Sequence, residues 1–323
     1  KNKVKAICQS HSVYHYALLV RLGIKYSIPT FVTQSSEQIY RLNKKSNIIE
    51  THFKNYPKIF ARQTKKNKKN FLDFAKKKMN MHLKGRLSAI PYVHKFSFSN
   101  KVSSHRVIIP NKKIKILIAS QCFIDAPHNY GKNLFTDHLE WLNYLAKFIN
   151  SKKNKYDWYL KTHNNLSPIS QNIIYDYLKK NKKIKLIPSN TPNNKIAKNG
   201  IDFVLTCWGS VGFEFAAMNI NVINASRNNP HIKYNFNHNP KSIKEYFNLI
   251  KNLNKNKKKI NKLKVLEYFF MKFYFYPQNW LLFNIDNPSN TPDNFGNSRV
   301  EQTQPIFFNH WTNYCNADIH TQT

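Results

Sequence analysis

From residue 112 onward, short runs rich in β-branched and aromatic residues alternate with stretches whose apolar residues recur at helical spacing. The β-rich runs cover residues 114–119, 158–161, 184–187, 203–206 and 222–224. The helical patterns cover residues 134–150, 167–180, 191–198 and 210–219. Strands that alternate with helices are typical of βαβ units, whose right-handed crossovers build a parallel sheet with helices on both faces. The sequence therefore predicts an α/β fold with a parallel, doubly wound sheet.

The flanking segments predict a second α/β unit and a C-terminal cover. The N-terminal third predicts strands at 4–7 and 30–32, and helical regions over 12–22 and 55–85. Two helical patterns follow residue 243, and the polar tail beyond them is expected to be irregular. Three regions result: an N-terminal α/β domain over 1–110, a ligand-binding domain over 111–260, and helices with a tail over 261–323 that pack across the domains. Because the chain begins at Lys1 without a methionine, we expect the first domain to start upstream.

The formal net charge of +36 resembles that of nucleic-acid-binding proteins, but the composition favours another explanation. Only seven of the 52 basic residues are arginine, and lysine and asparagine are abundant throughout the chain. Nucleic-acid surfaces use arginine with interleaved aromatic residues, so nucleic acid is not predicted to be a partner. The charge still attracts anions such as nucleotides, acidic glycans and anionic lipid head groups.

The cysteines and the apolar runs exclude several classes of protein. The four cysteines are far apart and form no C-x-x-C pair, which predicts neither a zinc site nor a disulfide framework. No run of about 18 apolar residues occurs, so the sequence predicts no membrane-spanning helix. We expect a cytoplasmic protein. Contact with the anionic cytoplasmic face of the inner membrane, through lysine-flanked aromatic residues near 268–276, is an alternative.

Residues 202–224 predict a buried strand, a Gly-Ser-x-Gly-x-Glu turn and a helix. Gly209 and Gly212 allow a tight turn and a close approach to a ligand. Ser210 can cap the helix, which would leave N–H groups and the positive end of the helix dipole facing an anion. Glu214, one turn into the helix, can reach the hydroxyls of a ribose or sugar. An ordinary strand-to-helix turn with a serine cap has the same pattern.

Other polar residues follow neighbouring strands. Asp125 and His128 come after the first predicted strand, and Lys161 and His163 come after the second. Because ligands bind at the carboxyl ends of parallel strands, we expect these side chains near the turn at 209–212. Together they could bind phosphate and perform acid–base chemistry near neutral pH. A histidine in such a loop is more often a structural hydrogen-bonding residue than a catalyst.

Residues 112–253 resemble the nucleotide-binding half of GT-B glycosyltransferases. They are most similar to proteins of bacterial capsule and surface-polysaccharide biosynthesis, including the Kdo transferases of capsule assembly. The resemblance is carried by KILIASQCFIDAPHNYGKNLFTDHLEWL, DWYLKTHNN, DFVLTCWGSVGFEFAAMNINVINAS and NNPHIKYNFNHNPKSIKEYFNLI, and more weakly by residues 10–24. It implies two Rossmann-like domains with parallel doubly wound sheets that face a cleft. His163 takes the place of the histidine in the family's K-x-H-P motif, and Asn164 replaces the proline.

The resemblance also implies roles for single residues. The donor phosphates would lie against Gly209, Ser210, Val211 and Gly212, and the ribose or sugar would meet Glu214. Asn229 and His231 follow the last strand and suit contact with a base or sugar, but a loop that only caps the sheet edge would have the same residues. Lys161 would offset the charge of the leaving phosphate. On the acceptor side the implied residues are His11 and His15. Asp125 is our first choice of general base, because His128 beside it can tune its pKa, and His163 completes the catalytic set.

The sequence thus predicts a glycosyltransferase that moves a sugar from a nucleotide sugar to a capsule or lipopolysaccharide chain. The donor is expected to be CMP- or UDP-linked, and the acceptor is a glycan or lipid-linked glycan. No D-x-D motif occurs, so we expect a metal-independent reaction without a cofactor. A sugar-nucleotide epimerase and a polyol-phosphate transferase of the same fold are alternatives, and a non-enzymatic nucleic-acid-binding protein is a third. The choice between an inverting and a retaining reaction stays open.

Overall fold

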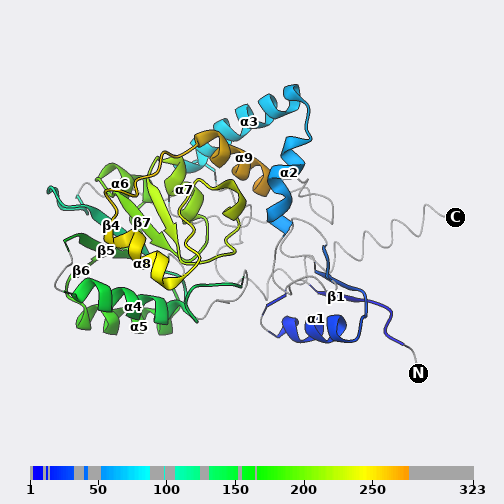
Figure 1. Cartoon of the computed structure of the whole chain (residues 1–323), viewed down its shortest axis with the longest axis horizontal. Coiled ribbons are helices and arrows are strands. Elements are labelled where there is room, and N and C mark those ends of the chain that lie inside the picture. The colour runs from blue at the N-terminus through cyan, green and yellow to red at the C-terminus, as the bar shows by residue number, and fades with distance from the viewer. Residues whose placement is uncertain are drawn as a thin grey trace.

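A computed structural model describes most of the chain and is shown in Figure 1. The described residues are 3–9, 12–13, 15–32, 40–42, 52–87, 98, 106–123, 131–151, 155–163 and 166–275. Its larger sheet has five parallel strands in the order β6-β5-β4-β7-β8. These are β4 (Lys115–Ala119), β5 (Asp157–Lys161), β6 (Ile184–Ile187), β7 (Phe203–Thr206) and β8 (Asn221–Asn224).

The strand order makes this sheet doubly wound. The chain passes outward from β4 to β5 and β6, and then returns to the other side of β4 to form β7 and β8. The direction of winding therefore changes between β4 and β7, which is the switch point where such sheets bind ligands. The predicted α/β fold with a parallel, doubly wound sheet is confirmed, and the five strands predicted for this sheet occur within one residue of the expected bounds.

Alternation along β4 gives the sheet two buried faces. Ile116 and Ile118 lie in one core, with α4, α5 and α8, and Leu117 and Ala119 lie in the other, with α6 and α7. The helices of the first face are α4 (His138–Asn150), α5 (Pro168–Lys180) and α8 (Ile243–Lys251). Those of the second face are α6 (Asn193–Lys198) and α7 (Val211–Ala217). Figure 1 shows these helices covering the sheet from both sides.

Helix α4 begins four residues later than the apolar spacing predicts. The Asp137 carboxylate accepts a hydrogen bond from the Glu140 N–H at 2.7 Å, so the cap fixes the helix start. The preceding segment instead lies along the chain that follows β8. There the Leu134 N–H donates to the Ala225 carbonyl oxygen at 2.9 Å. This pairing holds residues 131–134 at the carboxyl edge of the sheet.

A third layer covers α7. It consists of α2 (Tyr56–Ala61), α3 (Lys65–Leu83) and α9 (Lys262–Phe273). Phe60, Met79 and Phe269 from these helices share a core with Phe213 of α7. The helical region predicted over 55–85 is therefore two helices, because the Thr64 hydroxyl caps α3 and starts a new helix. Helices from both ends of the chain thus pack against the helix that follows β7.

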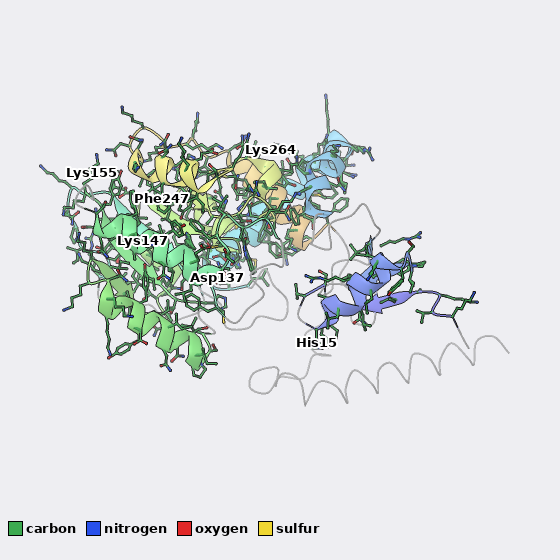
Figure 2. The ribbon with its side chains drawn as sticks, turned by 60° about the horizontal axis from the view of Figure 1, so that its bottom comes forward. His15, Asp137, Lys147, Lys155, Phe247 and Lys264 are labelled. Carbon is green, nitrogen blue, oxygen red and sulfur yellow. The ribbon has the colours of Figure 1, made fainter. Side chains whose placement is uncertain are left out.

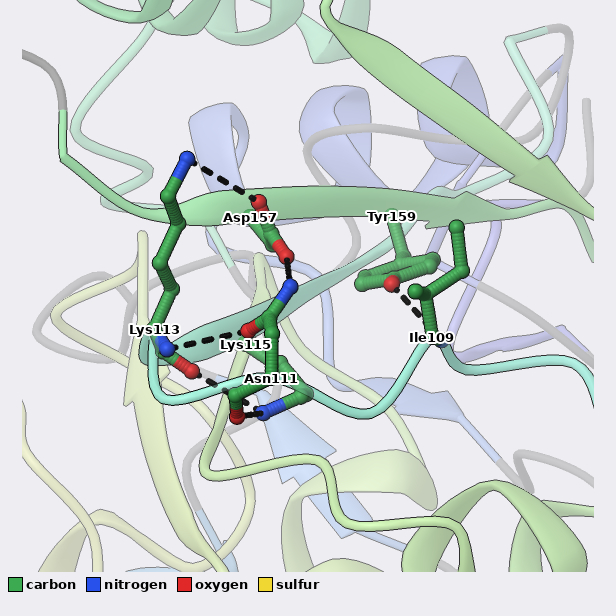
Figure 3. A network of polar contacts seen from close by, with 6 residues as sticks. All are labelled: Ile109, Asn111, Lys113, Lys115, Asp157 and Tyr159. Atoms are coloured by element: carbon green, nitrogen blue, oxygen red, sulfur yellow. Dashed lines mark hydrogen bonds and ion pairs between the residues drawn. The ribbon is translucent and has the colours of Figure 1, made fainter.

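A polar network holds the amino edge of the five-stranded sheet, which is opposite the carboxyl edge where residues 131–134 lie (Figure 3). Asn111 donates from its amide to the Asp157 carboxylate, and the Lys115 ammonium donates to the carbonyl oxygens of Asn111 and Lys113 at 2.8 and 3.0 Å. The Ile109 N–H donates to the Tyr159 hydroxyl at 3.1 Å. These contacts fix the entry to β4.

The N-terminal part contains a smaller sheet in the order β1-β2-β3. Its elements are β1 (Ile7–Gln9), α1 (Tyr16–Lys25), β2 (Thr30–Val32) and β3 (Tyr40–Leu42). β1 and β2 are parallel and joined by α1, and β3 is antiparallel to β2. Gly23 allows α1 to approach β2, because a β-carbon there would lie 2.1 Å from the Thr30 hydroxyl oxygen. The domain limits at residues 110 and 260 stay predictions.

None of the helices in the described part of the chain combines the length and the apolarity needed to cross a membrane.

Candidate functional site

The loops after β4 and β7 meet beside the switch point. The Gln121 side chain, two residues beyond β4, donates to the Thr206 hydroxyl at 3.1 Å and to the Trp208 carbonyl oxygen at 2.8 Å. Gln121 therefore joins the loop that follows β4 to the turn that follows β7. This turn is the segment for which the sequence predicts a phosphate-binding role.

The turn itself is built around Gly209, whose φ angle is +116°. Only glycine adopts this conformation without strain, so the predicted tight turn has a physical basis. The predicted serine cap is wrong. Ser210 has helical backbone angles (φ −61°, ψ −31°), and its hydroxyl makes no capping hydrogen bond. A capping residue needs an extended backbone for its side chain to reach back to the helix N–H groups, and Ser210 is already part of the helical turn.

Gly212 is required by the imidazole that lies against it. A β-carbon at Gly212 would lie 2.3 Å from Cε1 and 2.7 Å from Nε2 of His231. His231 is 1% exposed, and its ring stacks on Phe236. The sequence predicted that Gly212 approaches a ligand; in the structure its neighbour is a buried side chain. Whether a ligand also approaches there stays a prediction.

Two amide groups fix the protonation of His231. Asn224 and Asn237 donate to its Nε2 at 3.3 and 3.0 Å, so the ring proton is on Nδ1. Complete burial lowers the His231 pKa to about 3, and the ring is therefore neutral at physiological pH. Asn229 is also buried, and its amide donates to Asn239 at 2.7 Å. The contacts that we predicted for Asn229 and His231 with a base or sugar stay predictions.

Glu214 is 3% exposed and has partners at both carboxylate oxygens. His82 of α3 lies 3.2 Å from one oxygen, and the Asn193 amide at the start of α6 donates to the other at 3.1 Å. The carboxylate thus connects three helices. The predicted contact of Glu214 with a ribose or sugar stays a prediction, and in this structure the carboxylate is held by protein donors.

Lys161 ends β5 and is 6% exposed. Burial lowers its pKa to about 8, and the negative charge of Glu214 partly offsets this shift. Lys161 and Glu214 are therefore close enough to interact. Lys161 thus brings a buried ammonium group to the carboxyl end of β5.

The remaining predicted residues are placed as follows. His163 is exposed just beyond β5, and His15 is exposed directly before α1, where its ring lies 4.0 Å from that of Tyr16. Val211 is the first residue of α7. Four others lie outside the described residues, namely His11, Asp125, His128 and Asn164.

The sequence reasoning missed His82 and Asn193. His82 lies in the lysine-rich helix α3. A signal was available, because Ala75, Met79 and His82 recur at positions i, i+4 and i+7, which marks one buried face of α3. Asn193 carried no comparable signal, because an asparagine at a helix start is ordinary.

Within the described ranges, no group of three or more His, Cys, Asp or Glu residues could hold a metal ion. The choice between metal-dependent and metal-independent transfer therefore stays a prediction from the sequence.

Comparison with known proteins gives structural similarities at low sequence identity. No protein-family model matches the chain, and no curated protein matches it. One similar solved structure is KpsC of Thermosulfurimonas dismutans, a β-Kdo 2,4-transferase. It has 12% identity and a TM-score of 0.48, over 81% of this chain and 78% of that chain. A β-Kdo 2,7-transferase KpsC of the same organism has 12% identity and a TM-score of 0.45, over 82% and 74% of the two chains. A glycosyltransferase of Rickettsia africae ESF-5 has 11% identity and a TM-score of 0.33, over 84% and 59%.

Proposed function

We propose that the chain is a GT-B-type glycosyltransferase that moves a sugar from a nucleotide-sugar donor to a growing cell-surface polysaccharide. The observation that carries this function is the arrangement beside the switch point. Gln121 holds the loop after β4 to the turn at Gly209, and the buried ammonium of Lys161 lies on the same edge. Parallel doubly wound sheets bind nucleotides at this position.

In this function the donor phosphates lie against the turn at 209–212, with Lys161 opposite the leaving phosphate. A preorganised cation in a site of low dielectric stabilises the charge that develops as the sugar departs. This chemistry needs no metal ion at the phosphate. Glu214 is assigned to the ribose or sugar hydroxyls, and its contacts with His82 and Asn193 fix its position.

The acceptor is a glycan or a lipid-linked glycan of a capsule or lipopolysaccharide. Its hydroxyl is deprotonated by Asp125, assisted by His128, and His163 lies at the end of β5, on the same edge as Lys161. His11 and His15 are assigned to the acceptor side. The donor is CMP- or UDP-linked, and the reaction takes place in the cytoplasm or at the cytoplasmic face of the inner membrane.

A thermal-shift screen against CMP, CDP, UDP and GDP tests the donor site. A nucleotide that binds only the folded protein stabilises it by about 2.7 kcal/mol at 100 times its Kd, which raises the Tm. We expect one nucleotide to do so and Ser210→Ala to weaken its binding about tenfold, since a hydrogen bond to a charged group is lost. Ser210 makes no capping bond, so this variant should fold normally.

Ser151→Ala is the matched control, because it removes a serine hydroxyl that bonds to Phe148 at the C-terminal end of α4. It should leave the nucleotide effect unchanged. The absence of a Tm increase with every nucleotide would contradict the proposed function. An unchanged effect in Ser210→Ala would remove the turn from the donor site. The main alternative is tested by incubating the protein with sugar conjugates of the nucleotide that binds, without an acceptor. Only an epimerase would change the configuration of the sugar under these conditions.

A further inference from the structure

Lys132 is held in an unusual backbone conformation at the carboxyl edge of the sheet. Gly131 and Lys132 both have positive φ angles, 57° and 52°. A β-carbon makes this conformation unfavourable, so its occurrence at a lysine suggests a function. The Lys132 carbonyl oxygen accepts a hydrogen bond from the Arg227 N–H at 2.9 Å, and Asn133 forms an antiparallel bridge with Ser226. The exposed Lys132 is thereby fixed beside the exposed Arg227, in the chain that follows β8.

Two short 3-10 helices bring further lysines to the same place. These are η1 (His52–Asn55) and η2 (Ile232–Tyr234). Phe53 of η1 is 1% exposed and shares a hydrophobic core with Tyr234 of η2. Lys54 and Lys233 are the direct neighbours of these two anchors in the sequence. Burial, followed by the positive charges of Lys132 and Lys233, lowers the Lys54 pKa. The ammonium groups of Lys132 and Lys233, from two other segments, therefore lie within electrostatic reach of Lys54.

This lysine cluster, defined as Lys54, Lys132 and Lys233, is not neutralised by the described part of the chain. The ion pairs formed there by lysine involve Lys113 and Lys264, which belong to other regions. Lys132 and Lys233 both repel Lys54 in the free protein. A bound anion would convert this repulsion into attraction, and the gain is larger for an anion with more than one charge.

We propose that the lysine cluster is a binding subsite for a phosphate or diphosphate group. Lysine binds phosphate as a point charge, and three of them match the charge of a diphosphate better than that of a carboxylate. The subsite lies on the sheet edge where ligands of such folds bind, and Lys54 contributes from the N-terminal part of the chain. The ligand that carries the phosphate rests on the proposed function. It is either the nucleotide donor or a phosphate-bearing acceptor.

Calorimetric titration of the full chain with inorganic pyrophosphate tests the subsite. Lys54→Gln and Lys132→Gln each remove one charge and should weaken binding about tenfold, and Lys54→Arg should retain it. The control is Lys155→Gln. Lys155 is an exposed lysine two residues before β5, at the amino edge of the sheet, and Figure 2 shows it far from Asp137, which marks the carboxyl edge. Without ligand, Lys54→Gln should unfold at the same or a higher temperature than wild type, because repulsion is relieved.

The same titrations with CDP, UDP, CMP and glycerol 3-phosphate identify the source of the phosphate. If the donor supplies it, the lysine variants lose affinity for the nucleotide, and pyrophosphate competes with it. If the acceptor supplies it, glycerol 3-phosphate binding is lost and nucleotide binding is not.

The subsite would be overturned if Lys54→Gln and Lys132→Gln both bound pyrophosphate as tightly as wild type. It would also be overturned if Lys155→Gln lost as much pyrophosphate affinity as those two variants. The outcomes for the subsite and for the proposed function differ. If the protein binds a nucleotide and its pyrophosphate affinity does not change in the Lys54 and Lys132 variants, the subsite is rejected and the proposed function is not. Lysine-dependent pyrophosphate binding without binding of any nucleotide supports the subsite and rejects the proposed function.

Discussion

His82 Nε2 lies 3.2 Å from Glu214 Oε1, although the two residues are 132 positions apart in the sequence. The other ring nitrogen of His82 lies 3.2 Å from the Leu87 carbonyl oxygen. Each ring nitrogen of His82 thus faces an oxygen atom of another part of the chain. This contact connects helix α3 to helix α7, which follows the predicted donor turn at 209–212.

Glu214→Ala should lower the free energy of unfolding by about 3 kcal/mol. The substitution leaves His82 and the Asn193 amide without their acceptor in a buried site, and it removes the negative charge beside Lys161. Urea denaturation at pH 7 measures the effect. Glu214→Gln should lose less, because the amide oxygen can still accept one hydrogen bond.

A double-mutant cycle with His82→Ala tests whether the pair is the cause. A coupling energy of about 1 kcal/mol or more is expected for two buried, hydrogen-bonded groups. Strictly additive losses would show that His82 and Glu214 stabilise the fold independently. Nucleotide binding by Glu214 variants must be compared at temperatures equally far below each Tm, since the substitution affects the fold as well as the site.

Gly212→Ala should destabilise the protein by about 1 to 3 kcal/mol. The new β-carbon would overlap the His231 ring, and the ring is buried and held by Asn224 and Asn237. Urea denaturation measures the loss. Adding His231→Ala should reduce the effect of the alanine, because the overlapping ring is gone. An equal loss with and without His231 would contradict the steric explanation.

The stability of the protein should fall below about pH 6.5 because of His231. Its folded-state pKa is about 3 and its ordinary value is 6.5, so the unfolded chain takes up a proton first as the pH falls. The stability is complete above pH 6.5 and is lost progressively from there down to pH 3. One such histidine accounts for about 2 kcal/mol between pH 7 and pH 5.

His231→Phe keeps a ring against Phe236 but cannot be protonated. We therefore expect its free energy of unfolding to change with pH by about 2 kcal/mol less than that of wild type over this range. Because the comparison uses the change in the free energy of unfolding with pH, a lower stability of the variant at pH 7 does not affect the result. His238, whose pKa is lowered to about 4 by burial and by Lys258, contributes equally to both proteins. Parallel pH profiles would contradict the buried neutral state of His231.

Lys161→Met should raise stability at pH 7 and lower nucleotide affinity. The Lys161 pKa is about 8 in the folded protein and 10.5 ordinarily, so burying the charged form costs up to about 3 kcal/mol. This cost is complete below pH 8 and disappears as the pH rises to 10.5. The advantage of the methionine variant should shrink over the same interval.

Chemical denaturation and nucleotide titration of the same samples separate the two effects. A tenfold loss of nucleotide affinity in a more stable protein is the expected result for a cation retained for ligand binding. A variant that is more stable and binds the nucleotide as tightly as wild type would remove Lys161 from the donor site.

Local sequence patterns were sufficient for the strands of the larger sheet but not for the smaller sheet or for every helix. The strand predicted over 4–7 is β1 at Ile7–Gln9, and β3 (Tyr40–Leu42) was not predicted. Runs such as residues 203–206 contain only residues that suit a buried strand, and such runs were placed to within one residue. The start of α4 was missed, because residues 131–134 pair with the chain after β8 instead of continuing the helix. The split between α2 and α3 was missed because the Thr64 cap interrupts a pattern that otherwise looks continuous.

The sequence alone determined the alternation of strands and helices, and from it the sheet edge to which Lys161 and the turn at Gly209 both belong. Both depend on short-range patterns and on the fixed handedness of βαβ crossovers. Only the tertiary structure decided that His231 fills the space beside Gly212 and that Glu214 is bound by His82. Burial and side-chain partners depend on which distant segments pack together, and the residues near one position in the chain do not contain that information.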